Sequence, residues 1–448
     1  MSLGRELAAR HLRELLNDEI QLKLEQGFSV PMHLRDEVKM ADYLALHEIE
    51  TQLESLPEPP ELNINEPLEW QVPSLDLPAW EPTEDQLQDK MLGAWYGRIA
   101  GCILGKPLEI HPFFESPKKL RQYLEATNQW PLQDFVVHDE AVAVAIAGQK
   151  LGCTPSQKGK ISYAQSDDDL RYTLCGLRIL DKHPRPETKH IAEYWASHWT
   201  PELTFTAEQA VIANTYAFGG PHPWAFPKKS LADYVALRQY RNPYREWIGA
   251  AIRADGWAFG FAGNPEHAAR AAQQDARYTH ERNGEYSEIF FSAWIAASFR
   301  MSSAEAFDVA LSTIPAGSRL AKTLVATRAK CEDGASLDEM LDYVAETTGH
   351  YHAVHAINNA AVCVAGVFLC GGDFEKAITT AVMFGLDTDC NGATVGSLMG
   401  SQMGASALPV EKWISPFNDT IDFEYLGEER QSITALAGWT ADLWRRLR

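Results

Sequence analysis

Two short acidic segments hold the side chains best suited to chemistry. Residues 166–169 read SDDD and precede LRYTLCGLRIL, which is typical of a helix, and residues 387–391 read DTDCN and precede a glycine-rich segment. One short polar side chain is enough to cap a helix, whereas adjacent carboxylates repel each other and require a positive group nearby. Carboxylate oxygens are also the ligands that Mg²⁺ prefers. The spacing alone favours helix capping and metal binding equally.

These segments must be positioned by helices, because helical periodicity dominates from residue 83 to the end. Thr83 and Gln86 form a capping-box pattern that predicts a helix start. Two stripes of glycine occur at every fourth residue, which predicts two central helices that pack closely: Gly93, Gly97, Gly101 and Gly105 in the first, and Gly392, Gly396, Gly400 and Gly404 in the second. We therefore expect an all-α domain over residues 83–448.

Residues 1–82 differ in character from this domain. Apolar residues recur at helical spacing in 1–56 and predict two amphipathic helices, with Gly27 and Pro31 between them. Residues 57–82 contain many prolines as well as apolar side chains, which predicts an extended strap lying on the larger body. We expect an add-on to a complete domain that could contact a protein partner or a second copy of the chain.

Composition limits the classes of function. The 448 residues carry 61 Asp and Glu against 40 Lys and Arg, a net charge of −21, which disfavours nucleic acid or a membrane surface as the main partner. The N-terminus has charges throughout, and the longest apolar run, 360–370, is shorter than a membrane span. Seven scattered cysteines without a CxxC pair support neither disulfides nor a zinc site. We expect a cytoplasmic protein.

Three motifs occur in an order that is informative. They are LGAWYGRIAGCILGKPLE at 92–109, SDDDLRYTL at 166–174, and GLDTDCNGATVGSLMGSQMGA at 385–405. With these motifs in this order, the chain from about residue 87 to 413 resembles the ADP-ribosylglycohydrolase family, which includes DraG-like and crystallin-like proteins. The segments between the last two motifs also fit the interior of that family: 248–259, 275–298 and 355–369. The resemblance implies an orthogonal helical bundle with a binuclear Mg²⁺ centre at the base of a cleft.

The resemblance also implies roles for individual residues. Two Mg²⁺ ions, for which Mn²⁺ can substitute, would be held by the acidic motifs, here Ser166, Asp167, Asp168, Asp387, Asp389 and Cys390. Glu109, Asp168 and Asp389 would be catalytic, with Glu109 linked to the metals or orienting water. The substrate would contact Gly105, His355, Asn358 and Asn391. The implied activity is hydrolysis of an α-glycosidic bond to ADP-ribose or a related ribosyl nucleotide, small or linked to protein, with the leaving group left open.

Some residues depart from the family pattern. Cys102 stands where the first motif commonly has aspartate, Cys390 where the last motif commonly has threonine, and Asp169 where a hydroxyl residue is usual. Thiol is a poor ligand for Mg²⁺. The alternatives are therefore a non-catalytic binding or structural protein on the same fold, or an immunity-type protein that binds a toxin through residues 1–82.

Other side chains in the sequence carry less specific signals. The histidines of GHYHAVH (349–355) do not share one helix face and fit loop or pocket positions better than zinc binding, and His138-Asp139 lacks the further residues of a metal phosphohydrolase. Asp255 is expected to pair with Arg253 or to approach the metals in place of residue 102. The aromatic segment 218–224 offers Trp224 for stacking on adenine.

Overall fold

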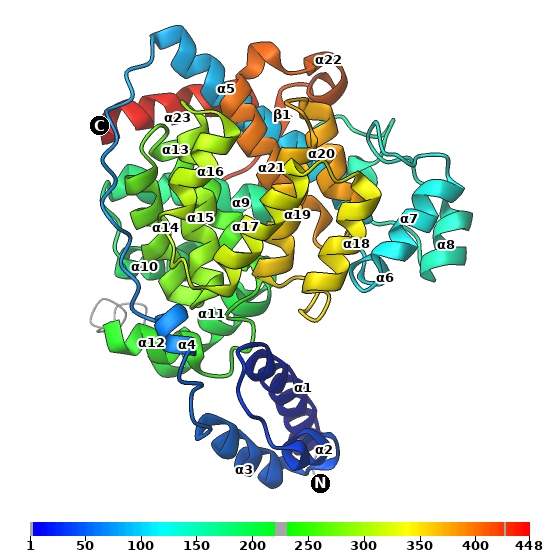
Figure 1. Cartoon of the computed structure of the whole chain (residues 1–448), viewed down its shortest axis with the longest axis vertical. Helices are drawn as coiled ribbons and strands as arrows, with labels where there is room; N and C mark the ends of the chain where they lie inside the picture. Colours follow the sequence, from blue (N-terminus) through cyan, green and yellow to red (C-terminus); the bar gives the residue numbers. More distant parts are fainter. Residues whose placement is uncertain (1–2, 220–230, 425–426) are drawn as a thin grey trace.

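The structure, a computed structural model, describes residues 3–219, 231–424 and 427–448. Within these residues the fold is helical apart from one short antiparallel pair of strands, β1 (Thr420–Ile421) and β2 (Gln431–Ser432) (Figure 1). The prediction of an all-α fold is confirmed. The segment that carries Trp224 lies outside the described residues.

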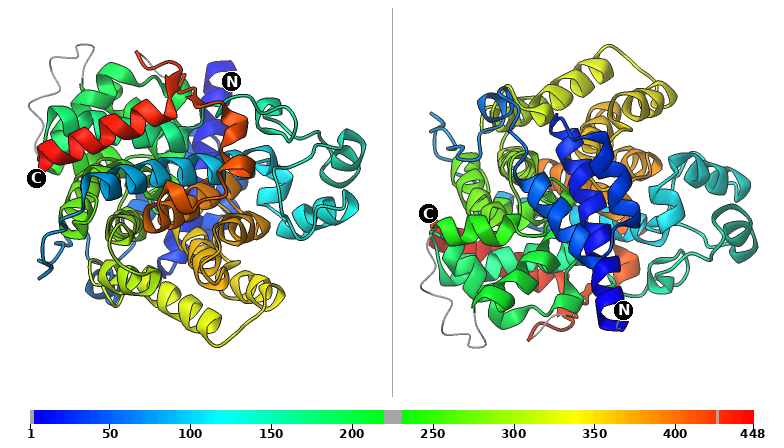
Figure 2. Two further views of the ribbon diagram at one scale, coloured as in Figure 1. Left: turned by 90° about the horizontal axis from the view of Figure 1, so that it is seen from above. Right: turned by 90° about the horizontal axis from the view of Figure 1, so that it is seen from below.

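Two helices without side chains along their contact line form the centre of the domain. They are α5 (Glu84–Gly105) and α21 (Thr388–Met403), and their glycines face each other as predicted. A Cβ atom on Gly97 would lie 2.0 Å from the carbonyl oxygen of Gly396, closer than any real contact. Only glycine permits this approach. The predicted capping box at Thr83 and Gln86 begins α5, and α23 (Ile433–Leu447) packs along another side of it (Figure 2, left).

The pair is surrounded by helices that bury aromatic side chains between them. α9 (Asp168–Lys182) and α13 (Ala254–Gly260) pack together, and α15 (Asn283–Ser298), α19 (Ala356–Leu369) and α20 (Phe374–Met383) contact α21. Every residue of α15 is buried, which makes it a core helix rather than an amphipathic one. Trp95, Trp257 and Trp294 are fully buried in this core.

The remaining helices complete the body. The α-helices are α6 (His111–Phe114), α7 (Pro117–Ala126), α8 (Glu140–Ala147), α10 (Thr188–His198), α11 (Thr206–Gly219), α12 (Leu231–Gln239), α14 (Pro265–Thr279), α16 (Ser303–Leu311), α17 (Arg319–Glu332), α18 (Leu337–Thr348) and α22 (Val410–Trp413). The 3₁₀ helices are η1 (Lys106–Leu108), η2 (Thr154–Ser156), η3 (Pro201–Leu203), η5 (Ile248–Arg253), η6 (Ala405–Ala407) and η7 (Ser415–Phe417). Among the described residues, no helix has both the length and the apolar character needed to cross a membrane.

The N-terminal arm contains three helices where the sequence predicted two. They are α1 (Leu3–Glu25), α2 (Met32–Met40) and α3 (Tyr43–Glu54). The break between α1 and α2 falls where it was predicted, but the second segment is interrupted at Asp42, whose side chain accepts the N–H groups of Leu44 and Ala45 and starts a new helix. The arm has its own small apolar core and lies across the underside of the body (Figure 2, right).

Buried polar contacts join the arm to the body. Arg245 pairs with Glu19 at 3.0 Å, and the side chain of Gln26 donates to Glu246 at 2.8 Å. The strap continues this attachment: α4 (Leu62–Asn65) is followed by Glu66, which pairs with Arg319 at 2.8 Å. The division at residue 82 stays a prediction, and these contacts show that polar side chains of residues 1–82 are buried against the domain.

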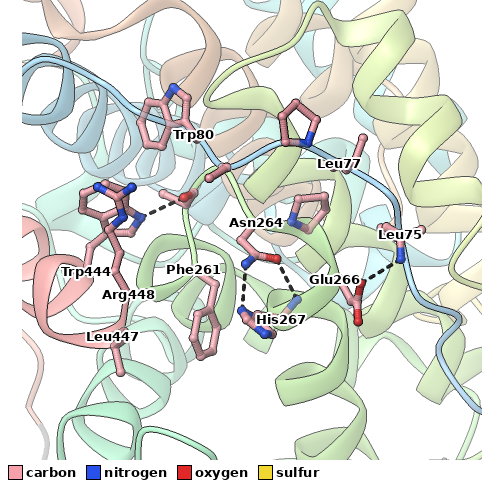
Figure 3. A pocket seen from close by; sticks show the side chains of 16 residues that line it. Leu75, Leu77, Trp80, Phe261, Asn264, Glu266, His267, Trp444, Leu447 and Arg448 are labelled. Atoms are coloured by element: carbon pink, nitrogen blue, oxygen red, sulfur yellow. Dashed lines mark hydrogen bonds between the residues drawn. The ribbon is translucent and has the colours of Figure 1, made fainter.

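A cavity of about 380 Å³ lies under the strap. Figure 3 shows its walls: Leu75, Leu77 and Trp80 of the strap, the turn before α14, and Trp444 of α23. Trp444 donates to the carbonyl oxygen of Ala262 at 2.8 Å, and Glu266 accepts the N–H of Leu75 at 2.7 Å. Its lining includes none of the residues in the two acidic segments. It is therefore a feature of strap packing and is separate from the site described next.

Candidate active site

The two acidic segments meet although about 220 residues separate them in the sequence. Asp167 is the N-cap of α9, and Asp387 occupies the same position at the start of α21. Ligand atoms of Asp169, Asp389 and Cys390 lie within 4.8 Å of one another. Those of Cys102, Asp167 and Asp389 form a second such group. Asp167, Asp168 and Asp169 form a third group, and Asp389 is the residue shared by the first two.

The glycine contact places these residues together. Gly105, at the end of α5, lies against the first residue of α21, and a Cβ atom there would be 2.2 Å from the carbonyl oxygen of Thr388. The Thr388 hydroxyl donates to the carbonyl oxygen of Gly105 at 3.0 Å. Gly105 was predicted to contact substrate, and in the structure it fixes the start of α21 beside the end of α5.

Three cationic side chains enter the cluster. The ammonium group of Lys106 pairs with Asp167. Arg98 is fully buried and pairs with Asp169 at 3.0 Å and with Asp255 at 2.9 Å. Arg171 donates to the hydroxyl of Ser166 at 3.1 Å. The expected pair between Arg253 and Asp255 is therefore absent from this part of the described structure, because Arg98 takes Asp255 instead.

Several carboxyl oxygens remain without a partner. Asp169 Oδ2, Asp387 Oδ1 and Asp389 Oδ1 are buried and have no hydrogen-bond partner among the described residues. Burial and the charge of Asp167 raise the pKa of Asp389 to about 7 and that of Asp168 to about 6. Burial and the charge of Asp389 raise the pKa of Asp387 well above its usual range. Such a cluster must bind either protons or cations, and its oxygen atoms fit a divalent metal ion.

A cavity of about 230 Å³ opens onto the cluster. Its lining includes Glu109, Asp168, Asp387 and Cys390, together with the aromatic side chains Phe114, Tyr172, Phe205 and Trp247. Glu109 follows η1, and its side chain is accessible from the cavity. Surrounding protein and the charges of Asp389 and Asp387 raise the pKa of Glu109 well above its usual range. The cavity therefore combines apolar walls with carboxyl groups that can exchange protons near neutral pH.

Comparison with known proteins identifies the family of the chain. A family model described as ADP-ribosylglycohydrolase matches residues 83–447. The chain belongs to the ADP-ribosylglycohydrolase family. A solved structure titled "ADP-ribosylglycohydrolase-related protein complex" is 18% identical and aligns over 81% of this chain and 100% of its own, with a TM-score of 0.48. No curated protein gives a significant match.

Membership of the ADP-ribosylglycohydrolase family supports a hydrolase of that kind acting on ADP-ribosyl substrates. The family is generally metal-dependent, and the acidic groups of this chain could hold a metal ion. The matched region contains Glu109, both acidic segments and the two glycine-striped helices.

Two residues expected to contact an ADP-ribosyl substrate occupy supporting positions. His355 is the buried N-cap of α19, and its Nε2 lies 3.6 Å from Glu25 of the arm and 3.8 Å from Glu246. Asn391 donates to Asn359 Oδ1 at 2.8 Å, and the same oxygen accepts the N–H of Asp387 at 3.1 Å. His355 thus lies buried between the arm and the body, whereas Asn391 shares Asn359 with the backbone of the second acidic segment.

Of the other expected residues, Asn358 lines a cavity and Ser166 is hydrogen-bonded within the protein. Asn358 lines a larger cavity of about 1030 Å³, which shares Phe114 with the cavity at the cluster. Ser166 donates to the carbonyl oxygen of Phe423 at 2.7 Å besides accepting from Arg171, so its hydroxyl is used within the protein. His352 stacks on Trp247 with ring centroids 4.1 Å apart. Asp139 caps α8, which accounts for the His138-Asp139 pair.

Glu208 lines the cavity but was not predicted. It lies in the first turn of α11, is buried, and pairs with Arg253. Burial raises its pKa to about 7. Arg253 also pairs with Asp275 at 2.6 Å and with Glu288 at 3.5 Å, so Glu208 belongs to a buried charge network behind the cavity. In the sequence, an acidic residue in a first helical turn is common on protein surfaces, and no signal marked this one.

Proposed function

We propose that the protein is a Mg²⁺-dependent hydrolase that cleaves an α-glycosidic bond to ADP-ribose or to a related ribosyl nucleotide. The observation that carries this proposal is the meeting of two acidic segments, with unpartnered buried oxygens on Asp169, Asp387 and Asp389, beside a cavity that contains Glu109. Family membership supports the hydrolase class, and the cluster supports the metal dependence.

The metal ligands would come from Asp168, Asp169, Asp387 and Asp389, whose oxygens are the hard donors that suit Mg²⁺, with Mn²⁺ as a substitute. When bound, such an ion supplies an orienting contact for ribose hydroxyls and lowers the pKa of a bound water. Cys390 contributes a thiol at the same place, and a thiol is a poor ligand for Mg²⁺.

The side chains around the cavity would orient water, stabilise charge and hold the sugar. Glu109 would orient water and accept its proton, because its side chain is accessible from the cavity. Carboxylates nearby stabilise the positive charge that develops on the sugar as the leaving group departs. Tyr172 and Trp247 supply apolar walls against which a ribose ring can pack while bulk water is excluded. A cavity of about 230 Å³ suits a sugar ring, so the rest of the substrate must extend beyond it.

The test is a substrate panel. Purified protein with Mg²⁺ would be incubated with ADP-ribose joined to arginine, to serine, to acetyl and to phosphate groups, and free ADP-ribose would be measured by mass spectrometry. We expect release from one class of conjugate and none when a chelator is present. Saturable metal binding without release from any conjugate would contradict hydrolysis and favour the non-catalytic binding protein.

A further inference from the structure

We propose that Lys106 is a built-in cation that takes the place of one divalent ion, so that the centre binds a single metal ion. The inference rests on the proposed metal-dependent function and concerns the composition of that same site. It follows from the unequal environments of the two groups of ligand atoms that share Asp389.

The first group, Cys102, Asp167 and Asp389, already contains a positive charge. Lys106 lies one helical turn after Cys102, is 9% exposed, and its ammonium group bonds to Asp167 Oδ2. The other oxygen of Asp167 accepts the N–H of Asp169 at 3.0 Å. Both oxygens of Asp167 are therefore engaged by donors of the protein itself. The buried ammonium group and the Asp167 carboxylate therefore form an ion pair inside the first group.

The same group is also poor in metal ligands. Cys102 supplies a sulfur where a carboxylate would be needed, and sulfur is a poor ligand for Mg²⁺. Asp389 is then the one member with an unpartnered oxygen among the described residues. A divalent ion placed here would have one free carboxylate oxygen and a fixed ammonium beside it, so binding is opposed by both ligand chemistry and charge.

The second group has the opposite character. Asp169 and Asp389 each present an unpartnered, buried oxygen, and Asp387 adds a third from the start of α21. Arg98 is the nearby cation, but it is shared between Asp169 and Asp255 and leaves Asp169 Oδ2 without a partner. The available ligands and the local charge therefore favour one divalent ion at the second group, whereas Lys106 neutralises the first group.

Metal stoichiometry tests the inference directly. Chelator-treated protein would be dialysed against Mn²⁺ and analysed by mass spectrometry of the metal and by electron paramagnetic resonance, which distinguishes an isolated Mn²⁺ from a coupled pair. We expect one ion per chain and an uncoupled spectrum for the natural protein. Lys106→Met removes the charge, keeps an aliphatic side chain, and should admit a second ion with a coupled spectrum.

The control is Lys90→Met. Lys90 lies on α5, the helix that ends next to Lys106, is partly buried, and donates to the carbonyl oxygens of Ser401 and Gln402. It is not part of the cluster, so this variant should keep one ion. Lys106→Gln serves as a second variant if Lys106→Met does not fold, and the natural protein's stoichiometry decides the question if neither folds.

The outcomes separate the two proposals. Two coupled ions in the natural protein would overturn the role of Lys106 and leave the metal-dependent function standing. One ion in folded Lys106→Met and Lys106→Gln would also overturn it, because the lysine would not be what excludes the second ion. No bound metal in any of the proteins would overturn both the inference and the proposed function.

Discussion

Replacing Asp389 by asparagine should stabilise the metal-free protein at alkaline pH. Asp389 is buried in the cluster, and burial together with the charge of Asp167 raises its pKa from an ordinary 3.8 to about 7. In the unfolded chain the same carboxyl loses its proton near pH 4. Between these values the folded state holds the extra proton, so the stability of the metal-free protein falls as pH rises from about 4 to about 7.

The size of this effect follows from the pKa difference. A difference of about three pKa units corresponds to roughly 4 kcal/mol in the free energy of unfolding. The unfolding entropy is about 2.1 cal/mol/K per residue. For 448 residues this gives about 0.9 kcal/mol/K, so 4 kcal/mol changes the melting temperature by about 4 °C. Asparagine keeps the shape of the side chain and has no proton to lose, so it escapes this penalty.

Calorimetric melting in the presence of a chelator measures the effect. At pH 8, Asp389→Asn should melt about 4 °C above the natural protein, and the difference should shrink to about 1 °C at pH 4.5. Added Mg²⁺ should stabilise the natural protein more than the variant. Asp76→Asn, at an exposed position of the strap, is the control and should leave the melting temperature unchanged at both pH 8 and pH 4.5. An Asp389→Asn protein that melts at or below the natural temperature at pH 8 would refute the reasoning.

The remaining predictions concern the helix contact, the arm and the thiol. Gly97→Ala should lower the free energy of unfolding by about 3 kcal/mol or more, because its methyl group would meet the backbone of α21. Gly438→Ala, in open space on α23, should stabilise the protein slightly. Equal denaturation midpoints for the two variants would contradict the close contact between the helices. A chain of residues 83–448 should keep its helical circular dichroism and bind metal. It should melt at a lower temperature than the full chain, because buried charges lose their partners in the arm. An unchanged melting temperature would show that the arm contributes nothing to stability. Cys390→Thr should keep or raise Mg²⁺ affinity in a calorimetric titration, since a hydroxyl is a harder ligand than a thiol, and a loss of affinity would contradict the placement of residue 390 beside the ion.

Local patterns in the sequence were enough to predict much of the fold. The capping box at Thr83 depends on residues three positions apart, and the glycine stripes depend on spacing along one helix, so both could be recognised without tertiary information. The stripes also implied a long-range contact, because glycine at every fourth residue is costly unless another backbone lies against it. The acidic segments were recognised for a similar reason, since repelling carboxylates need compensation.

The rest depended on contacts that no local pattern records. Glu208 became part of the cavity only because α11 packs where Arg253 can pair with it. His355 was expected near substrate, yet the arm covers it with Glu25, a residue about 330 positions away in the sequence. No pattern in the sequence singled out Lys106, because its pairing with Asp167 depends on the end of α5 lying beside the start of α9.

The most direct test of the central claim compares metal binding with turnover in three proteins. The natural chain, Asp389→Asn and Glu109→Gln would be assayed for Mg²⁺-dependent release of ADP-ribose from the best substrate of the panel, and for Mg²⁺ affinity by calorimetry. We predict that Asp389→Asn loses affinity and rate together, whereas Glu109→Gln keeps most of its affinity and loses roughly a hundredfold in rate. Full activity in both variants would show that the chemistry takes place elsewhere in the protein.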